Sequence, residues 1–330
     1  MRRLPLLRLA AASLASLLVS TASAQDKLTF LIDWLPAGDK AVPYLGVKGG
    51  FFAAENLEVT VQSARGSSEV VTRLATGVAD LGTGGIAALF QARASGAVPV
   101  KALLPIYTQQ PDAIFTTKGS GIEALGDVVG KRVATASASS SNVTWPLVLQ
   151  QNKIDPAAVN LLRVDPGALA PMLASGQVAA TINWTTVAPG FEKTLKEAGK
   201  ELVIIPWSKY GYDGYGLSLF ASEKMLKERP EVVRRFVRAY QKASEAALAN
   251  PKAAAEALKS MVPEVDVAVA TAQFEASRSL MVNAVTQKDG FGRFEASRVA
   301  KTWEWVSKSM SLPLDKIDPA AAIDAGFVAK

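Results

Sequence analysis

Cysteine and histidine are both absent from the 330 residues of this sequence. Their absence excludes disulfide bonds, thiolate zinc sites, cysteine nucleophiles and histidine-based catalytic triads, because each of these needs a side chain that the chain does not have. Two common serine motifs, the G-x-S-x-G elbow and the S-x-x-K pair, are also missing. We therefore predict a protein that binds its ligand without catalysing a reaction, and we expect neither a cofactor nor a bound metal.

Positive charge is concentrated at the start of the chain. Three arginines within the first eight residues precede an apolar run that is too short for a permanent membrane helix, and residues 22–24 form a small A-S-A cleavage box. This order predicts a signal peptide over residues 1–24, cleavage before Gln25 and export to the periplasm; an uncleaved N-terminal anchor is the alternative. Lipid attachment is not expected, since it needs a cysteine.

The remaining chain has little excess charge and no second long apolar run. Without the three leader arginines it keeps 33 basic and 30 acidic side chains, a net charge of +3 that is too small to predict binding to nucleic acid. No later run reaches the roughly 20 apolar residues that a membrane helix requires. We therefore predict a globular, monomeric protein with a small-molecule ligand.

Short apolar stretches alternate with helical patterns up to Trp207, which predicts parallel sheets covered by helices on both faces. Two segments repeat one order of elements: RLATGVADLGTGG, residues 73–85, and MLASGQVAATINW, residues 172–184. Each indicates a helix, a glycine stop, a strand and a loop of small or polar residues, as expected of equivalent units in two similarly wound lobes. From Pro230 onward the pattern is almost wholly helical.

This order of elements predicts an α/β protein of two lobes, in which the first lobe is discontinuous along the chain. We assign residues 25–112 and 218–330 to lobe I and residues 113–217 to lobe II, with connecting segments at 110–113 and 214–220. Each lobe should contain a mostly parallel sheet flanked by helices. Two lobes joined by paired connections can close on a ligand by hinge motion.

Ligands of open α/β sheets bind beyond the carboxyl ends of the strands, so the loops at these ends hold the candidate site. These loops span residues 33–40, 82–86, 137–142, 183–187 and 210–215. The candidate ligand-binding residues within them are Asp33, Trp34, Lys40, Gly84, Gly85, Ser140, Ser141, Asn183, Trp184, Tyr212, Asp213 and Tyr215.

Each group of candidates has a functional and a structural interpretation. The two tryptophans could cover a flat ligand from opposite lobes, or they could pack in the core. The two glycines could offer backbone amides at a helix start, or they could form only a tight turn. The two serines could share their hydroxyls with a ligand, or they could cap a helix. The tyrosines and the aspartate between them could contact the ligand, or the ring cluster could stiffen the hinge.

Four stretches of the sequence resemble the periplasmic solute-binding proteins of ABC importers. They are LIDWLPAGDKAVPYLGVKGGFFAAENLEVTV, GSSEVVTRLATGVADLGTGG, GIEALGDVVGKRVATASASSSN and YGYDGYGLSLFASEKMLKERPEVVRRFVRAY. Within that group the chain is similar to the NMT1/THI5-like branch, which takes up thiamine-pyrimidine precursors, sulfonates and nitrate-like anions. The resemblance runs from about residue 27 to residue 306. It implies a type II periplasmic binding fold, a small organic solute as ligand, and a permease and its ATPase at the inner membrane as partners.

One position departs from the pyrimidine-binding members of that family. Those members carry an Asp-Trp pair followed by a histidine; Asp33 and Trp34 match the pair, whereas Lys40 stands where the histidine would be. The yeast-type pyrimidine synthase also uses a cysteine cluster, which is missing here. The resemblance therefore favours a binding protein for a planar nitrogen heterocycle, with a sulfonate or other small anion next. The alternatives are a pyrimidine-synthase-like enzyme and a soluble sensor subunit that acts on a receptor kinase.

Lys40 bears most directly on the chemistry of the ligand. A buried lysine needs a carboxylate partner, which could be Asp33, Asp39 or an acidic group on the ligand. We expect the adjacent Asp39 to point away, which makes an anionic or zwitterionic ligand plausible. The alternative keeps Lys40 on the surface without a partner and leaves Asp33 to bind the amino group of a neutral heterocycle.

Overall fold

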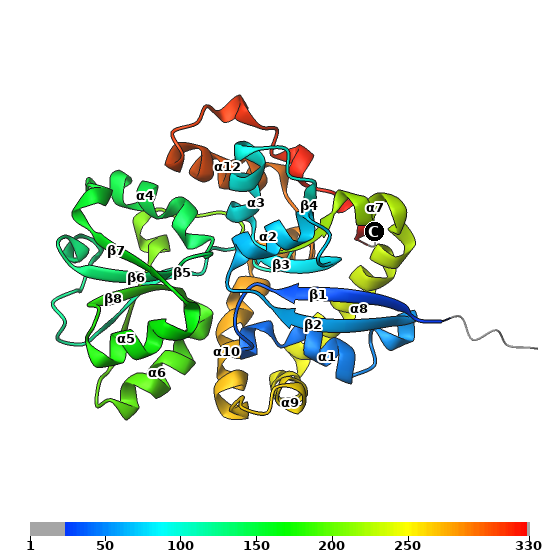
Figure 1. Cartoon of the computed structure of the whole chain (residues 1–330), viewed down its shortest axis with the longest axis horizontal. Helices are drawn as coiled ribbons and strands as arrows, with labels where there is room; N and C mark the ends of the chain where they lie inside the picture. Colours follow the sequence, from blue (N-terminus) through cyan, green and yellow to red (C-terminus); the bar gives the residue numbers. More distant parts are fainter. Residues whose placement is uncertain (1–23, 329–330) are drawn as a thin grey trace, which may run out of the picture.

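The computed structural model describes residues 24–328, and the predicted leader, apart from its last residue Ala24, lies outside these residues. The described chain contains two five-stranded sheets, with strand orders β2-β1-β3-β10-β4 and β7-β6-β8-β5-β9 (Figure 1). The strands of lobe I are β1 (Asp26–Ile32), β2 (Leu57–Ser63), β3 (Leu81–Gly85), β4 (Val100–Pro105) and β10 (Leu217–Ser222). The strands of lobe II are β5 (Asp112–Thr117), β6 (Arg132–Ala136), β7 (Asn160–Val164), β8 (Ala180–Trp184) and β9 (Leu202–Pro206).

The two sheets are wound in the same way. In each described sheet four strands run in one direction and one runs against its two neighbours, β10 in lobe I and β5 in lobe II. Each of these reversed strands is the first that the chain forms after it crosses from the other lobe. The repeated segments end in β3 and β8, which hold the same central place in their sheets. The predictions of mostly parallel sheets and of equivalent units are both confirmed.

The helices cover both faces of each sheet, and their ranges follow. They are α1 (Val42–Lys48), α2 (Ser67–Ala75), α3 (Ile86–Ser95), α4 (Ser141–Gln151), α5 (Leu169–Ser175), α6 (Ala188–Glu197), α7 (Glu223–Glu228), α8 (Pro230–Ala249), α9 (Pro251–Met261), α10 (Val267–Met281), α11 (Ala284–Asp289) and α12 (Ala296–Ser309). Apolar clusters fill both sides of each sheet. On one side of lobe I, the ring of Phe236 from α8 stacks on Phe30 of β1 and on Phe52.

The C-terminal helices connect the two lobes. Helix α12 packs against α3 of lobe I and α4 of lobe II, and α10 packs against α9 of lobe I and α6 of lobe II. The side chain of Trp305 from α12 belongs to the apolar core of lobe II, while Val143 from α4 belongs to a core of lobe I. The helical third of the chain therefore forms part of the interface between the lobes.

Two neighbouring segments carry the chain between the sheets. The backbone N–H of Gly216 donates to the carbonyl of Tyr107 at 2.9 Å, and the side-chain amide of Gln110 donates to the carbonyl of Tyr215 at 2.5 Å. Both predicted connections extend too far, because the last four residues of 214–220 already pair with β3 and the last two of 110–113 already pair with β8. The predicted lobe bounds therefore move by one residue, so that Asp112 belongs to the sheet of lobe II and Leu217 to the sheet of lobe I. The crossing itself ends at Gly216.

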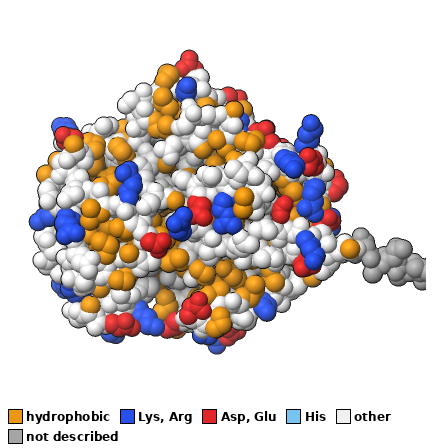
Figure 2. Space-filling model, in the orientation of Figure 1, with side chains coloured by type: hydrophobic (Ala, Val, Ile, Leu, Met, Phe, Trp, Pro, Cys, Tyr) orange, Lys and Arg blue, Asp and Glu red, His pale blue; other side chains and the backbone are white. Residues whose placement is uncertain are grey.

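The outer surface carries charges of both signs. Figure 2 shows basic and acidic side chains interspersed over the face that it presents, with apolar side chains between them. Within residues 24–328, no helix combines the length and the apolar character needed to cross a bilayer.

Candidate ligand-binding site

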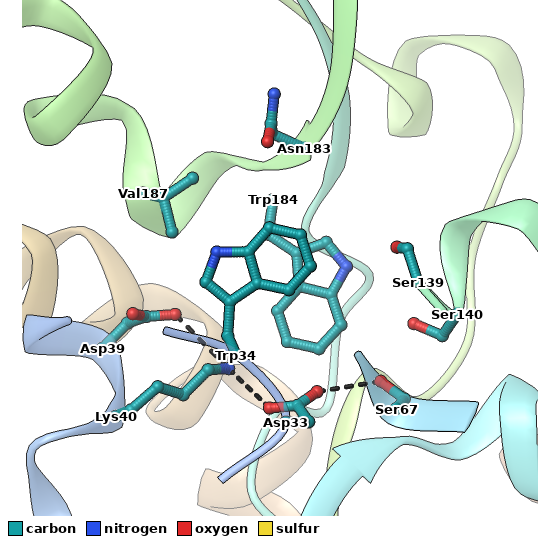
Figure 3. A pocket seen from close by; sticks show the side chains of 10 residues that line it. All are labelled: Asp33, Trp34, Asp39, Lys40, Ser67, Ser139, Ser140, Asn183, Trp184 and Val187. Carbon is teal, nitrogen blue, oxygen red and sulfur yellow. Dashed lines mark hydrogen bonds and ion pairs between the residues drawn. The ribbon is translucent and has the colours of Figure 1, made fainter. Parts of the chain in front are cut away.

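A pocket lies between the lobes at the carboxyl ends of β1 and β8. Its cavity volume is about 20 Å³, room for about one water molecule, so the lobes are closed on each other around it. Figure 3 shows the side chains that line it. Lobe I contributes Asp33, Trp34, Asp39, Lys40 and Ser67, and lobe II contributes Ser139, Ser140, Asn183, Trp184 and Val187.

The loop after β1 carries most of the charge of the pocket. Asp33 and Trp34 follow the last residue of the strand directly, and a short 3₁₀ turn over Gly38–Lys40 brings the next charged residues back beside them. Gly38 makes this return possible, because a Cβ there would lie 1.7 Å from the carbonyl oxygen of Ala270 in α10. Its N–H also donates to the side chain of Gln273 on the same helix, at 2.8 Å.

Lys40 is the centre of a buried ion triad. Its ammonium nitrogen lies 3.1 Å from Oδ1 of Asp33 and 3.4 Å from Oδ2 of Asp39, and all three side chains are almost fully buried. Burial by itself would lower the pKa of Lys40, but the charges of Asp33 and Asp39 outweigh it and raise that pKa. Lys40 is therefore a cation inside the protein.

The expected orientation of Asp39 was wrong. Its carboxylate turns inward to Lys40, because the hydroxyl of Thr186 in lobe II donates to Oδ2 of Asp39 at 2.8 Å. Lys40 consequently has two protein carboxylates as partners, and the unpaired surface position considered for it is also wrong. An acidic group on the ligand is not needed to balance its charge.

Each of the two tryptophans of the pocket packs against the lobe to which it does not belong. Trp34 comes from lobe I and packs against an apolar core of lobe II, whereas Trp184 comes from lobe II and packs against a core of lobe I. The ammonium group of Lys40 lies 4.4 Å from the ring centre of Trp184, a cation–π distance. The exchange of side chains holds the lobes in contact around the pocket (Figure 3).

The side chain of Ser67 connects a backbone amide of the site to the carboxylate of Asp33. The hydroxyl of Ser67 donates to Oδ2 of Asp33 at 2.8 Å and accepts the backbone N–H of Gly85 at 2.9 Å. Ser140 faces Gly85 across the cleft so closely that a Cβ on this glycine would lie 2.3 Å from the serine hydroxyl. Gly85 thus permits close approach of the lobes, while its amide is used by Ser67 and not offered to a ligand.

A third buried carboxylate lies behind Trp184. Asp112, the first residue of β5, accepts hydrogen bonds from the hydroxyl of Ser141, at 2.5 Å, and from the side chain of Trp184. Burial raises the pKa of Asp112 to about 6, against the effect of these two donors. Ser141 therefore supports the pocket from behind and does not line it.

Gly85 and four other predicted residues do not line the pocket either. Gly84 lies under the ring of Phe220, where a Cβ would be 2.7 Å from the nearest ring carbon. The ring of Tyr212 packs on Trp305, 4.9 Å between ring centres.

The other two lie on the side of the connection that faces α12. Asp213 forms ion pairs with Arg298 and Lys301 of that helix, and the hydroxyl of Tyr215 accepts the N–H of Glu295 at 2.7 Å. The connection at 210–215 therefore fastens the helical third of the chain.

Sequence reasoning missed Ser67, Asp39, Ser139 and Val187 among the lining residues. Ser139 and Val187 lie in loops that were selected, but small or apolar side chains give no chemical signal of their own. Ser67 is the first residue of helix α2, which directly precedes β3 in the chain, and β3 pairs with β1 in the sheet. The pairing of these two strands is therefore the signal that could have identified Ser67. In the described residues, no three acidic side chains cluster in a way that could hold a metal ion.

Comparison with known proteins identifies relatives of two kinds. A sequence model for the family described as NMT1/THI5 like matches residues 39–254. The chain is 25% identical to the riboflavin-binding protein RibY of Chloroflexus aurantiacus, over 88% of this chain and 83% of that protein. It is 24% identical to the 4-amino-5-hydroxymethyl-2-methylpyrimidine phosphate synthase of Candida albicans, over 76% of each.

Solved structures share the fold at low sequence identity. The alkanesulfonate-binding protein SsuA from Xanthomonas axonopodis pv. citri, bound to MOPS, superposes with a TM-score of 0.70 at 16% identity, covering 91% of this chain and 98% of that one. The aliphatic sulphonate-binding protein SsuA from Escherichia coli gives 0.64 at 15% identity, covering 90% and 97%. The predicted periplasmic binding protein fold is confirmed.

Proposed function

The chain belongs to the NMT1/THI5-like family, and from that premise we propose that it captures a small organic solute between its lobes and delivers it to the permease and ATPase of an ABC importer. The observation that carries the proposal is the pocket itself, which is built jointly by the two lobes and closed by their exchanged tryptophans. A site of this kind is complete only when the lobes are together. A ligand that contacts both lobes would shift the open and closed populations, and a permease could recognise the closed form.

The side chains that line the pocket favour a planar nitrogen heterocycle, which would enter when the lobes part. Trp34 and Trp184 offer flat apolar faces, while Asp33 and Asn183 supply polar atoms at the edge. The names of two relatives, a riboflavin-binding protein and a pyrimidine phosphate synthase, concern ligands of this class. The sulfonate-binding structures are 15–16% identical to this chain, and the likeness to them extends to the fold alone.

Identification of the retained solute tests the proposal directly. The full chain, purified from a bacterial periplasm without denaturation, should carry a solute that native mass spectrometry can weigh and identify. Calorimetry against aminopyrimidines, flavins, taurine-like sulfonates and aromatic carboxylates then ranks the classes. Binding of sulfonates alone would overturn the heterocycle assignment.

The pyrimidine synthases among the relatives favour catalysis as a second candidate function. Mass spectrometry of the solute after prolonged incubation separates the two. Recovery of an unchanged solute supports binding and release, whereas conversion at a rate proportional to protein concentration supports an enzyme.

Export to the periplasm is part of the proposal. The A-S-A motif at residues 22–24 precedes Gln25, and β1 begins at the next residue, Asp26. N-terminal sequencing of the protein from the envelope fraction should begin at Gln25. Recovery of the intact leader in that fraction would favour the membrane anchor.

A further inference from the structure

We propose that the pocket selects a ligand that presents hydrogen-bond donors, with neutral or positive charge, at the edge facing Asp33 and Asp39, and that it rejects anions. The proposal rests on the function proposed above and specifies the chemical class of the ligand. It is carried by two independent features of the lining residues, their charge balance and their balance of donors and acceptors.

The charge balance of the lining is negative. Asp33 and Asp39 are buried with a single cation, Lys40, between them, and the remaining lining residues are uncharged. Asp112 behind Trp184 adds no positive charge. A buried excess of negative charge is unfavourable unless a ligand compensates for it, so a donor or a cation gains affinity here and an anion loses it.

Most hydrogen-bond donors of the lining have partners within the protein. The hydroxyl of Ser67 donates to Asp33, and the amide nitrogen of Asn183 donates to the hydroxyl of Thr181 at 2.7 Å. The ammonium of Lys40 makes no hydrogen bond in the described chain, but its charge is balanced by ion pairs with Asp33 and Asp39, and it lies against the face of Trp184.

Two acceptors of the lining, in contrast, are open. Oδ1 of Asp39 and Oδ1 of Asn183 have no hydrogen-bond partner in the described chain, although each residue is at least 95% buried. Oδ1 of Asp33 is paired with the ammonium of Lys40 at 3.1 Å. Figure 3 shows the amide oxygen of Asn183 on the pocket side, opposite the carboxylates. Buried acceptors need donors. A ligand with N–H groups on both edges would satisfy acceptors of both lobes at once.

A sulfonate or carboxylate ligand has the opposite requirement. Its oxygens need donors or a free cation, and the cation of this lining is already neutralised by Asp33 and Asp39. A third negative charge beside these two carboxylates would be repelled by them, and such repulsion between like charges weakens binding. The family fold is thus combined here with a lining that excludes anions.

Four flat probes of matched shape and different charge test this selection: benzamidine, benzamide, benzoate and benzenesulfonate. Binding to the full chain, freed of retained solute, is measured by tryptophan fluorescence and confirmed by calorimetry. We expect benzamidine to bind at least about 100-fold more tightly than benzoate or benzenesulfonate, with benzamide between them.

Two outcomes would overturn the selection, and they differ in what else they overturn. Equal or tighter binding of either anion would leave a planar ligand in place and refute the charge selection alone. Failure of all four probes to bind, together with a retained solute that is not planar, would refute the proposed ligand class as well.

The variant Asp39→Asn tests whether the ion triad causes the preference for benzamidine over the anions. It keeps the shape of the side chain and one ion pair with Lys40 while it brings the lining to neutrality, so the ratio of benzamidine to benzoate affinity should fall at least about 10-fold. Glu58→Gln removes a negative charge from the exposed edge of β2 and should leave the ratio unchanged. Because a ratio is measured within one preparation, a partly unfolded sample does not alter it. An unchanged ratio in Asp39→Asn would overturn the proposal.

Discussion

The two lobes bury carboxylates in different ways. Lobe I places Asp33 and Asp39 around Lys40, whereas lobe II holds Asp112 with two neutral donors, the hydroxyl of Ser141 and the side chain of Trp184. The consequence for lobe II is a pKa of about 6 at Asp112, raised by burial. In lobe I a cation thus stabilises the two carboxylates that line the pocket, whereas in lobe II the carboxylate behind Trp184 has no cation and is partly protonated near pH 6.

The largest effect is expected where lobe I loses its cation. Lys40→Met keeps the length of the side chain but leaves Asp33 and Asp39 without a partner, which should destabilise the fold by about 3–5 kcal/mol. Urea denaturation measures the change.

A second lysine supplies the control for this variant. Lys193 pairs with Asp266 across the lobes at 2.7 Å, but both side chains are exposed to solvent. Lys193→Met should leave the stability unchanged within error. Equal stability losses in the two variants would show that the buried carboxylates of lobe I need no cation.

The next effect concerns the carboxylate of lobe II. The pKa of Asp112 is about 6 in the folded protein against an ordinary value of 3.8, so the native state binds the extra proton between these pH values. Its contribution to stability is therefore greatest at acid pH and falls by about 2 kcal/mol as pH rises from 4 to 6. The difference in unfolding free energy between the wild type and Asp112→Asn, measured by urea denaturation at each pH, should follow this course. A difference that rises with pH would contradict it.

The sequence predicted the framework that makes this comparison possible. The helix–glycine–strand repeat identified β3 and β8 as equivalent strands, and three of the five selected loops meet at the pocket. The orientation of Asp39 could not be predicted, because it depends on Thr186, a residue 147 positions away in the other lobe. The same reason applies to Asp213, whose partners lie on α12. Periodicity reports which face of an element is buried, but not which distant side chain meets it.

Equivalent strands also end in contrasting residues. Strand β3 ends at Gly85 and β8 ends at Trp184, and these ends face each other, since a Cβ on Gly85 would lie 3.3 Å from the indole. One lobe supplies a large side chain and the other the space for it. Closure therefore depends on a glycine in lobe I as much as on a tryptophan in lobe II.

Filling that space should prevent closure. Gly85→Val would place carbon within 2.3 Å of the hydroxyl of Ser140, so the lobes should remain apart and the affinity for the retained solute should fall by about 100-fold. Small-angle scattering should show that the solute no longer compacts the variant. Gly96→Ala is the control, because a Cβ at Gly96 meets no atom within 4 Å. Normal affinity in Gly85→Val would show that the lobes need not approach this closely.

The smallest effect is expected from the ring of the lobe I tryptophan. Trp34→Leu keeps an apolar side chain on the core of lobe II but removes the flat face, and a stacking contact of this kind is worth about 1 kcal/mol, or about fivefold in affinity. The neighbouring Leu35 is 39% exposed and does not line the pocket, so Leu35→Ala should bind the retained solute as the wild type does. Calorimetry on both variants distinguishes stacking from a general loosening of the loop after β1. Equal losses in the two variants would mean that Trp34 contributes through the packing of that loop, and the pocket would then have one aromatic face, from lobe II, instead of two.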